Sequence, residues 1–311
     1  MTKLTIRNYQ GEDDYWRIRN FLREVYLLDD RHELGWQAAR LDYWRWHMIM
    51  NVEVVNSIEE AILLWETDDG RIGAVINNVD SCHEVALTIH PNFRTPEFVD
   101  EMLDSAEKNW GTPGKNFFAF AHSSDPMREN ILRARGYTEG SGLKEHQWRR
   151  DLTTPLPDVI VPEGYSVRAI GEIGGDEWPQ RSWASWLVFH PDEPDDAYDP
   201  DWRWNLNWSH APLYRRDLDI VAISPDGKVV AYCILWYDDA TRTALFDPVA
   251  VIPEHQRRGL GRAIVTEAMR HAKEMGAVLT TVSGFEPGAN ALYSSALSAD
   301  HDINVPWVKV L

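Results

Sequence analysis

Residues 245–277 read LFDPVAVIPEHQRRGLGRAIVTEAMRHAKEMGA, and this stretch decides the fold of the chain. It opens with an apolar, β-rich segment, turns at Pro253 and passes through a basic loop that holds two glycines. Apolar residues then recur at helical spacing as far as the stop signal Gly276, at Ile264, Val265, Ala268, Met269 and Ala272. The pattern predicts a strand, a glycine loop and a helix, in that order.

The two glycines lie at the predicted N-terminus of this helix. The first turn of a helix leaves backbone N–H groups without intrahelical partners and carries the positive end of the helix dipole. Gly259 and Gly261 let an anion reach that backbone without meeting a Cβ atom. Positive charge around the anion comes from Arg257, Arg258 and Arg262. The loop therefore predicts a site for a phosphorylated ligand.

Two common phosphate loops do not fit the sequence. A Walker loop needs Lys followed by Ser or Thr after its last glycine, and Arg262 and Ala263 stand there instead. The dinucleotide-binding fingerprint needs three glycines, and this loop has two. The segment QRRGLG at residues 256–261 resembles instead the Q/R-x-x-G-x-G/A loop of the GNAT superfamily of N-acyltransferases, which binds the pyrophosphate of acetyl-CoA in that family.

The segments after the loop extend the resemblance through the C-terminal half. A second strand is predicted over residues 278–283, and residues 290–293 are similar to the family's N-x-x-A/L-x-x-Y region. The resemblance implies an N-acetyltransferase that uses acetyl-CoA as its acyl donor. The residues that it implies for acetyl-CoA binding are Val249, Ala250, Val251, Gln256, Arg257, Arg258, Gly259, Leu260, Gly261, Arg262 and Asn290.

Pro248 interrupts the predicted strand before the loop. A proline inside a strand marks a bulge or an edge, where no ladder N–H is needed. In the GNAT family the fourth strand bulges and parts from the fifth, and the pantetheine of acetyl-CoA lies between them. The resemblance therefore implies a bulge at Pro248 and backbone contacts to pantetheine at Val249 and Val251.

The resemblance also implies catalytic residues. Tyr293 is the candidate general acid that protonates the thiolate of CoA, and a tyrosine packed on the sheet is the alternative. Alternation from Val249 puts Asp247 on the same face as Leu245, the position where some family members carry a catalytic Glu. Asp247 is the candidate base for the acceptor amine, directly or through water. A structural role for Asp247 beside Pro248 is the alternative.

Other candidates for the base are weaker. Glu286 and His255 are outside possibilities, and His255 also fits a solvated loop. Neither Cys nor Ser is placed for a covalent relay, so the sequence favours direct transfer while both substrates are bound together. Two alternative functions stay open: a non-catalytic acyl-CoA sensor or scaffold, and a peptide or protein N-acetyltransferase.

The resemblance implies that a tryptophan-rich segment between residues 178 and 214 forms the acceptor side of the site. Tryptophan together with carboxylates suits a primary amine of a small molecule, and a cationic amine is favoured. The alternative is that the tryptophans belong to the core between two domains. The residues concerned are Trp178, Trp183, Trp186, Trp202, Trp204 and Trp208, with acidic residues between Asp192 and Asp201.

The two halves of the chain share an internal repeat. Asp69-Gly-Arg-Ile is echoed by Asp226-Gly-Lys-Val, and Ile89-His-Pro is echoed by Val251-Ile-Pro. Each Asp-Gly pair between β-rich segments predicts a hairpin turn. The repeat indicates an ancient duplication.

The repeat predicts a domain of residues 1–152, a proline-rich linker of residues 153–163 and a domain of residues 164–311. The resemblance implies an α/β fold for both, each a central mixed, mostly antiparallel sheet flanked by helices. In the N-terminal copy, residues 91–97 replace the glycine loop and Glu97 brings negative charge to the helix start. We expect this copy to have lost its acetyl-CoA site. Tandem arrangements of this kind occur in the family, in mycothiol synthase for example.

Composition argues against several other classes of protein. The net charge of −18 disfavours nucleic-acid binding, and no apolar run is long enough for a membrane span. We expect a cytoplasmic monomer or homodimer without a signal peptide. The 11 histidines show no metal-ligand spacing, so no metal is expected. Cys82 and Cys233 both fall in strand-like segments and are expected in the core.

Overall fold

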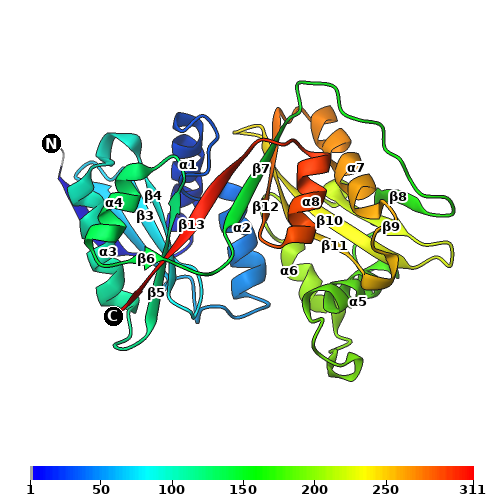
Figure 1. Ribbon diagram of the computed structural model, residues 1–311, viewed down its shortest axis with the longest axis horizontal. Helices are drawn as coiled ribbons and strands as arrows, with labels where there is room; N and C mark the ends of the chain where they lie inside the picture. Colours follow the sequence, from blue (N-terminus) through cyan, green and yellow to red (C-terminus); the bar gives the residue numbers. More distant parts are fainter. Residues whose placement is uncertain (1–2) are drawn as a thin grey trace. The chain divides into compact units, whose positions relative to one another are not determined.

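The computed structural model describes residues 3–311 and divides the chain into two compact units (Figure 1). Unit 1 contains the chain up to Gln147 together with Asp302–Leu311, and unit 2 is the continuous segment Trp148–His301. In each unit, helices cover both faces of a mixed, mostly antiparallel sheet. The predicted fold class, two similar α/β halves, is confirmed.

Unit 2 carries the predicted strand, loop and helix. Its strands are ordered β7-β12-β11-β10-β9-β8, with β11 and β12 parallel and the pairs from β8 to β11 antiparallel. Helices α7 and α8 pack on one face of this sheet through an apolar cluster that includes Cys233, Ile264 and Met269. Helix α5 packs on the other face, where the guanidinium of Arg181 lies over the ring of Tyr232. The elements are β7 (Glu145–Asp151, its last part in this unit), β8 (Ser166–Ala169), α5 (Glu177–Phe189), α6 (Leu206–Ser209), β9 (Asp219–Ile223), β10 (Val229–Asp238), β11 (Thr243–Val251), α7 (Leu260–Glu274), β12 (Leu279–Gly284) and α8 (Pro287–Ala296).

Unit 1 repeats this order of elements. Its strands are ordered β1-β2-β3-β4-β5-β13, with β4 and β5 parallel. Tyr15 of α1 and Leu41 of α2 pack on one face of the sheet, and Met102 of α3 and Leu132 of α4 pack on the other. The elements are β1 (Leu4–Asn8), α1 (Glu12–Leu28), α2 (Ala38–Tyr43), β2 (Ile62–Thr67), β3 (Ile72–Asn78), β4 (Glu84–Ile89), α3 (Pro96–Trp110), β5 (Asn116–His122), α4 (Pro126–Ala134), β6 (Thr138–Glu139) and β13 (His301–Val310).

Matching hairpin turns show the predicted repeat directly. Asp69 lies in the turn between β2 and β3, and Asp226 lies in the turn between β9 and β10. In the first turn the Thr67 hydroxyl donates to the Asp69 carboxylate, and in the second the Ser224 hydroxyl donates to the Asp226 carboxylate. The two halves therefore share their turn chemistry as well as their order of elements.

The units differ from the predicted domains in two respects. β13 follows unit 2 in the chain but belongs to unit 1, where residues 304–310 pair antiparallel with β5. The predicted linker, residues 153–163, contains neither helix nor strand and is mostly exposed, but it connects β7 to β8 within unit 2. A strand pattern predicts that a segment is extended without specifying which sheet edge it joins, so the sequence does not show this exchange.

The two cysteines have different environments. Cys233 is buried in β10 as predicted, and burial raises the pKa of its thiol well above the ordinary range. Cys82 is exposed, so its predicted core position is wrong. It lies in the turn between β3 and β4, where its backbone N–H donates to the Asp80 carboxylate. Among the helices of residues 3–311, none combines the length and the apolar composition that crossing a membrane requires.

Candidate active site

β11 bulges at Pro248, as predicted. The register between β10 and β11 shifts there, so that Ile234 of β10 alone faces Asp247 and Pro248 of β11. An extra residue of this kind bends a strand and increases its twist. Proline suits the position because a bulged residue needs no ladder N–H.

β11 parts from its parallel neighbour β12 at the same point. Their register runs from Thr243, opposite Leu279, to Phe246, opposite Val282, and in the described chain it does not continue over residues 247–251. On its other side, β11 stays paired with β10 at residues 249–251. One edge of this part of β11 is therefore open to a ligand that binds backbone, as the resemblance implies for pantetheine.

The bulge also corrects one inference from the sequence. Regular alternation placed Val249 on the same face of β11 as Leu245 and Asp247. In the structure Val249 packs against the apolar cluster that contains Ala244 and Phe246, and Leu245 is outside that cluster. Because of the extra residue, side chains after the bulge point to the opposite face from the one that regular alternation predicts. The alternation before the bulge therefore cannot be continued beyond it.

The N-terminus of α7 presents backbone N–H groups without a side-chain cap. Its N-cap is Gly259, whose φ of 89° is left-handed and favours glycine. The first helical hydrogen bond runs from the Ala263 N–H to the Gly259 carbonyl at 3.0 Å, so the N–H groups of residues 260–262 precede the helical ladder. Gly261 lies close to α8, since a Cβ atom there would be 3.1 Å from Leu292 Cδ2 and would require a small shift of that side chain.

The three arginines of the loop differ in how they are held. The Arg258 guanidinium donates to the Tyr165 hydroxyl at 3.1 Å and to the Glu254 carbonyl at 3.0 Å. Arg257 and Arg262 are exposed on either side of the helix start. Arg258 therefore supports the loop, and the other two leave their charge available to an anion.

Two residues predicted to bind acetyl-CoA have partners within the protein. The Gln256 side-chain amide donates to the Val251 carbonyl at 3.0 Å and fastens the loop to the end of β11. The Asn290 side-chain oxygen accepts from the Trp148 indole N–H at 2.8 Å, and its amide donates to the Phe285 carbonyl at 3.3 Å. Sequence reasoning missed Trp148, because 142 residues separate it from Asn290 and no local pattern connects them.

Tyr293, the candidate general acid, is packed on α8 against the end of β12. Its side chain is 6% exposed, and a Cβ atom on Gly284 would lie 3.1 Å from its ring. Burial, and then the neighbouring Asp247 and Cys233, raise the pKa of the Tyr293 phenol above its ordinary range. The hydroxyl therefore keeps its proton at neutral pH, and Asp247 is within electrostatic reach of it.

Asp247, the candidate base, is half-buried in the bulge. Its backbone carbonyl accepts from the Trp236 indole N–H at 2.6 Å, which ties the bulge to β10. The backbone of Asp247 thus has a structural role, and its carboxylate stays the candidate base.

α3 of unit 1 begins differently from α7. The Thr95 hydroxyl accepts from the Phe98 N–H at 3.3 Å, and Pro96 at the first helical position has no N–H. Glu97 adds negative charge to the first turn. Of the three donors that α7 leaves open, one is missing and one is capped in α3, which supports the prediction that the N-terminal copy has no acetyl-CoA site.

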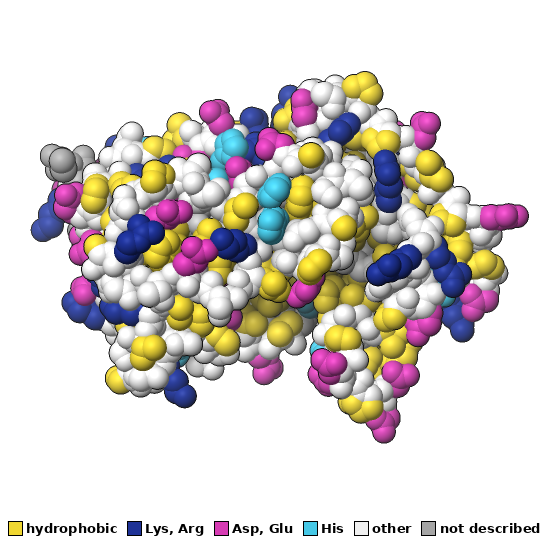
Figure 2. Space-filling model, viewed as in Figure 1, with side chains coloured by type: hydrophobic (Ala, Val, Ile, Leu, Met, Phe, Trp, Pro, Cys, Tyr) yellow, Lys and Arg dark blue, Asp and Glu magenta, His cyan; other side chains and the backbone are white. Residues whose placement is uncertain are grey.

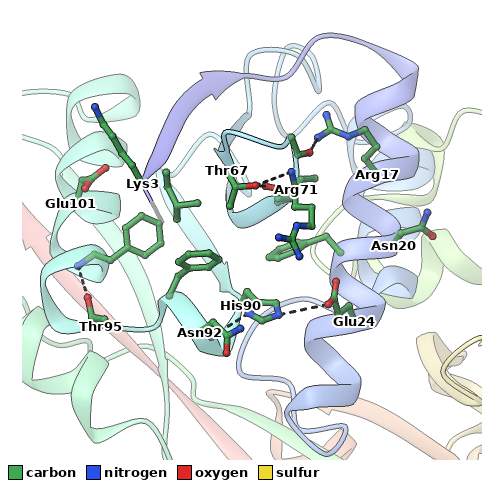
Figure 3. A pocket seen from close by; sticks show the side chains of 16 residues that line it. Lys3, Arg17, Asn20, Glu24, Thr67, Arg71, His90, Asn92, Thr95 and Glu101 are labelled. Carbon is green, nitrogen blue, oxygen red and sulfur yellow. Dashed lines mark hydrogen bonds and ion pairs between the residues drawn. The ribbon is translucent and has the colours of Figure 1, made fainter. Parts of the chain in front are cut away.

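A pocket of about 990 Å³ in unit 1 lies beside this start of α3 (Figure 3). Several charged side chains that line it are paired with neighbours. Arg17 forms ion pairs with Asp14 and Glu66, and His90 Nε2 lies 3.6 Å from a Glu24 carboxylate oxygen. The pairing neutralises much of the positive charge in this pocket, so it does not resemble the anion site of α7.

The tryptophans of the predicted acceptor side fall into two groups. Trp178 and Trp208 are buried on either side of the Arg181 guanidinium, whose carbon lies 4.6 Å and 4.8 Å from their ring centroids. Trp186 stacks on His190 with 4.0 Å between ring centroids. The half-buried group comprises Trp183, Trp186, Trp202 and Trp204. Core packing accounts for the first group, and the second group is partly exposed.

The acidic residues that follow α5 are exposed. Figure 2 shows acidic side chains on the segment that projects from unit 2 below α5. They are Asp192, Glu193, Asp195, Asp196, Asp199 and Asp201. This segment gives the predicted acceptor side a negative charge.

Residues 176–297, all within unit 2, match the model of the acetyltransferase (GNAT) family. Similar curated proteins are mycothiol acetyltransferases. That of Paenarthrobacter aurescens is 24% identical over 261 residues, covering 79% of this chain and 76% of its own, and that of Thermobispora bispora is 26% identical over 229 residues, covering 67% and 70%. Unit 2 therefore carries an acetyltransferase domain of the GNAT family.

Solved structures show that the fold of GNAT proteins extends through both units. A GCN5-related N-acetyltransferase from Sphaerobacter thermophilus has a TM-score of 0.66 at 16% identity, covering 98% of this chain and 95% of its own. A tandem GNAT protein from the clavulanic acid biosynthesis pathway has a TM-score of 0.60 at 17% identity, covering 99% and 98%. At these identities the likeness concerns the fold alone.

Proposed function

We propose that unit 2 transfers an acetyl group from acetyl-CoA directly to a primary amine of a small molecule, with both substrates bound together. The observation that carries this proposal is the uncapped N-terminus of α7 beside the open edge of β11. Acetyl-CoA, when bound, supplies a thioester carbonyl that an amine can attack. The residues of unit 2 supply binding, orientation and proton transfer.

The donor side fits the chemistry of acetyl-CoA. The N–H groups of residues 260–262, with Arg257 and Arg262 beside them, provide the donors and positive charge that a pyrophosphate needs. The open edge of residues 249–251 offers backbone groups to the amides of pantetheine. Gln256 and Arg258 keep the loop in place through their bonds to neighbouring residues.

Two side chains perform the proton transfers in this proposal. Tyr293 donates its proton to the departing sulfur, since its raised pKa keeps the hydroxyl protonated. Asp247 accepts the proton of the amine, directly or through water. Cys233 is buried and its thiol pKa is raised, so it does not serve as a nucleophile, which supports direct transfer.

The acceptor side supports a small cationic amine. Half-buried tryptophan faces attract cations, and the exposed carboxylates after α5 add long-range attraction. The related proteins are named for mycothiol and not for a protein substrate. Both observations favour a small-molecule acceptor over a peptide.

We expect acetyl-CoA to bind once per chain. The start of α7 is open to an anion, whereas Thr95, Pro96 and Glu97 close the start of α3. Calorimetric titration of the full chain should therefore give a stoichiometry close to one. Thr95→Ala, which opens a donor in unit 1 alone, serves as the control and should leave the affinity unchanged. Two equivalent sites per chain would contradict the assignment.

The proposed reaction is tested by the release of CoA. We expect the wild-type chain to release CoA from acetyl-CoA when a small primary amine is present, and polyamines to be better acceptors than neutral amines because of the exposed carboxylates. A thiol-reactive chromophore follows the release across polyamines, aminoglycosides and amino acids. The N-acetylated form of each accepted amine is the control. Release with peptides and with none of the small amines would refute a small-molecule acceptor.

A further inference from the structure

Three side chains from distant parts of unit 1 converge on one point. His32 follows α1, His122 ends β5, and Asp302 begins the part of β13 that belongs to unit 1. Asp302 Oδ2 lies 2.6 Å from His32 Nδ1 and 3.5 Å from His122 Nε2, and the three potential ligand atoms are all within 4.8 Å of one another. We propose that this cluster binds a divalent transition-metal ion, for which zinc is the best match.

The donor set fits zinc in kind and in size. Zinc takes imidazole nitrogen and carboxylate oxygen at about 2.0–2.2 Å, which puts tetrahedral ligand atoms roughly 3.4 Å apart. The ligand atoms of the cluster reach this spacing through shifts of about 1.5 Å or less. Calcium and magnesium prefer sites made of oxygen alone, so two imidazoles select against them. Three protein ligands leave a fourth position for water.

The backbone brings the ligands together. Asn304 is opposite His122 in the register of β13 and β5, and the Ser123 N–H donates to the Ile303 carbonyl at 2.7 Å. These main-chain contacts set Asp302 beside the end of β5. The rings of His32 and His122 are nearly perpendicular, at 84°, with centroids 6.4 Å apart, so each can direct a nitrogen to a common point without stacking.

The cluster combines a buried ligand with an open approach. His122 is 1% exposed, and in the described chain its Nε2 atom has no hydrogen bond. Its contact with Asp302 Oδ2, at 3.5 Å, is too long for a good hydrogen bond, so this buried nitrogen can take a metal ion as a closer partner. The His32 and Asp302 side chains are 44% and 21% exposed, which gives an ion a path from solvent.

Ser124 determines whether the other ring nitrogen of His122, Nδ1, accepts or donates a hydrogen bond. Its hydroxyl oxygen lies 2.7 Å from His122 Nδ1, and its backbone N–H donates to the same nitrogen at 3.1 Å. Nδ1 is the acceptor in this arrangement, so the proton of the neutral ring is on Nε2. Coordination through Nε2 requires that proton to move to Nδ1, where it donates to Ser124 Oγ, and the Ser124 backbone N–H must then give up its bond to Nδ1.

Sequence spacing could not show this cluster. His32 and Asp302 are 270 residues apart, whereas the expectation of no metal was based on histidines that are close in the sequence. The ligands come from a loop, a strand end and a strand that returns to unit 1, so only the fold assembles them.

The full chain is first freed of metal with a chelator, and its titration with zinc is then measured by calorimetry. We expect one Zn²⁺ per chain in competition with a chromogenic chelator. His32→Ala and Asp302→Asn should each weaken binding at least about tenfold, and Ser124→Ala should weaken it by about tenfold through the lost acceptor. His83→Ala, a partly exposed histidine of unit 1 outside the cluster, is the matched control and should leave zinc affinity unchanged.

A second readout keeps the proposal falsifiable if a variant folds poorly. Zn²⁺ should raise the melting temperature of the wild type, and Co²⁺ in its place should give the visible absorption of a four- or five-coordinate ion that Asp302→Asn lacks. No zinc binding by the wild type would overturn the proposal. So would equal binding by folded His32→Ala and Asp302→Asn, or an equal loss in His83→Ala.

Discussion

Gly261→Asp is expected to weaken acetyl-CoA binding by about 30-fold or more. The new carboxylate enters the first turn of α7, among the N–H groups of residues 260–262 that we assign to the pyrophosphate. Losing charge-assisted contacts of this kind typically costs about 2–5 kcal/mol, and the lower figure corresponds to about 30-fold. The contact of a Cβ atom with Leu292 adds a smaller cost. Equilibrium titration with acetyl-CoA measures the change.

Two matched variants separate charge from volume and from fold. Gly261→Asn has nearly the same size without the charge, so the difference between Asn and Asp isolates the electrostatic effect. An acidic residue in the first turn of a helix stabilises it, so Gly261→Asp should fold. Glu97→Gln removes a carboxylate from the first turn of α3 in unit 1 and should leave the affinity unchanged. A folded Gly261→Asp chain with wild-type affinity would refute our assignment of the loop.

Tyr293→Phe is expected to lower kcat by about 100-fold while the affinity for acetyl-CoA stays the same. A positioned general acid contributes roughly 10²–10⁴-fold, and the lower end applies because a thiolate is already a fairly good leaving group. The loss should fall on kcat, because the proton is transferred only as the sulfur departs. Steady-state kinetics with one accepted amine, together with a binding titration, measure both quantities.

A second tyrosine provides the control for Tyr293. Tyr137 is also buried, but it lies in unit 1, where its hydroxyl donates to Glu107 at 2.9 Å. Tyr137→Phe should cost some stability and leave kcat unchanged. Equal turnover by wild type and Tyr293→Phe would remove Tyr293 from the mechanism and leave it a packing residue.

The parts of the fold that depend on neighbouring residues could be predicted from the sequence. The helix that follows the glycine loop and stops before Gly276, and the bulge at Pro248, appear where local pattern and proline chemistry put them. Gly259 has the left-handed conformation that its place at a helix start requires. Each of these features is determined within a few residues, and their order along the chain is what resembles the GNAT family.

The features that escaped prediction depend on residues far apart in the chain. The indole of Trp148 in β7 donates to Asn290 of α8, and Thr95 can be identified as a cap only after the structure has placed the start of α3. The bulge turns Val249 to the opposite face of β11, because one extra residue changes the facing of the strand residues that follow it. Cys82 has strand-like neighbours but occupies a turn. These features depend on which strands pair and in which register, and local periodicity in the sequence does not give that information.

The membership of β13 in unit 1 sets an order for folding during synthesis. Unit 2 is one continuous segment, so all of its residues leave the ribosome before residues 302–310 do. Until then the sheet of unit 1 has β5 as an unpaired edge, and the buried Trp307 is missing from its core. Domains generally complete in the order of synthesis. In this chain unit 2 can complete its fold first. Until β13 is synthesised, unit 1 keeps an unpaired strand edge at β5 with which other nascent chains could pair.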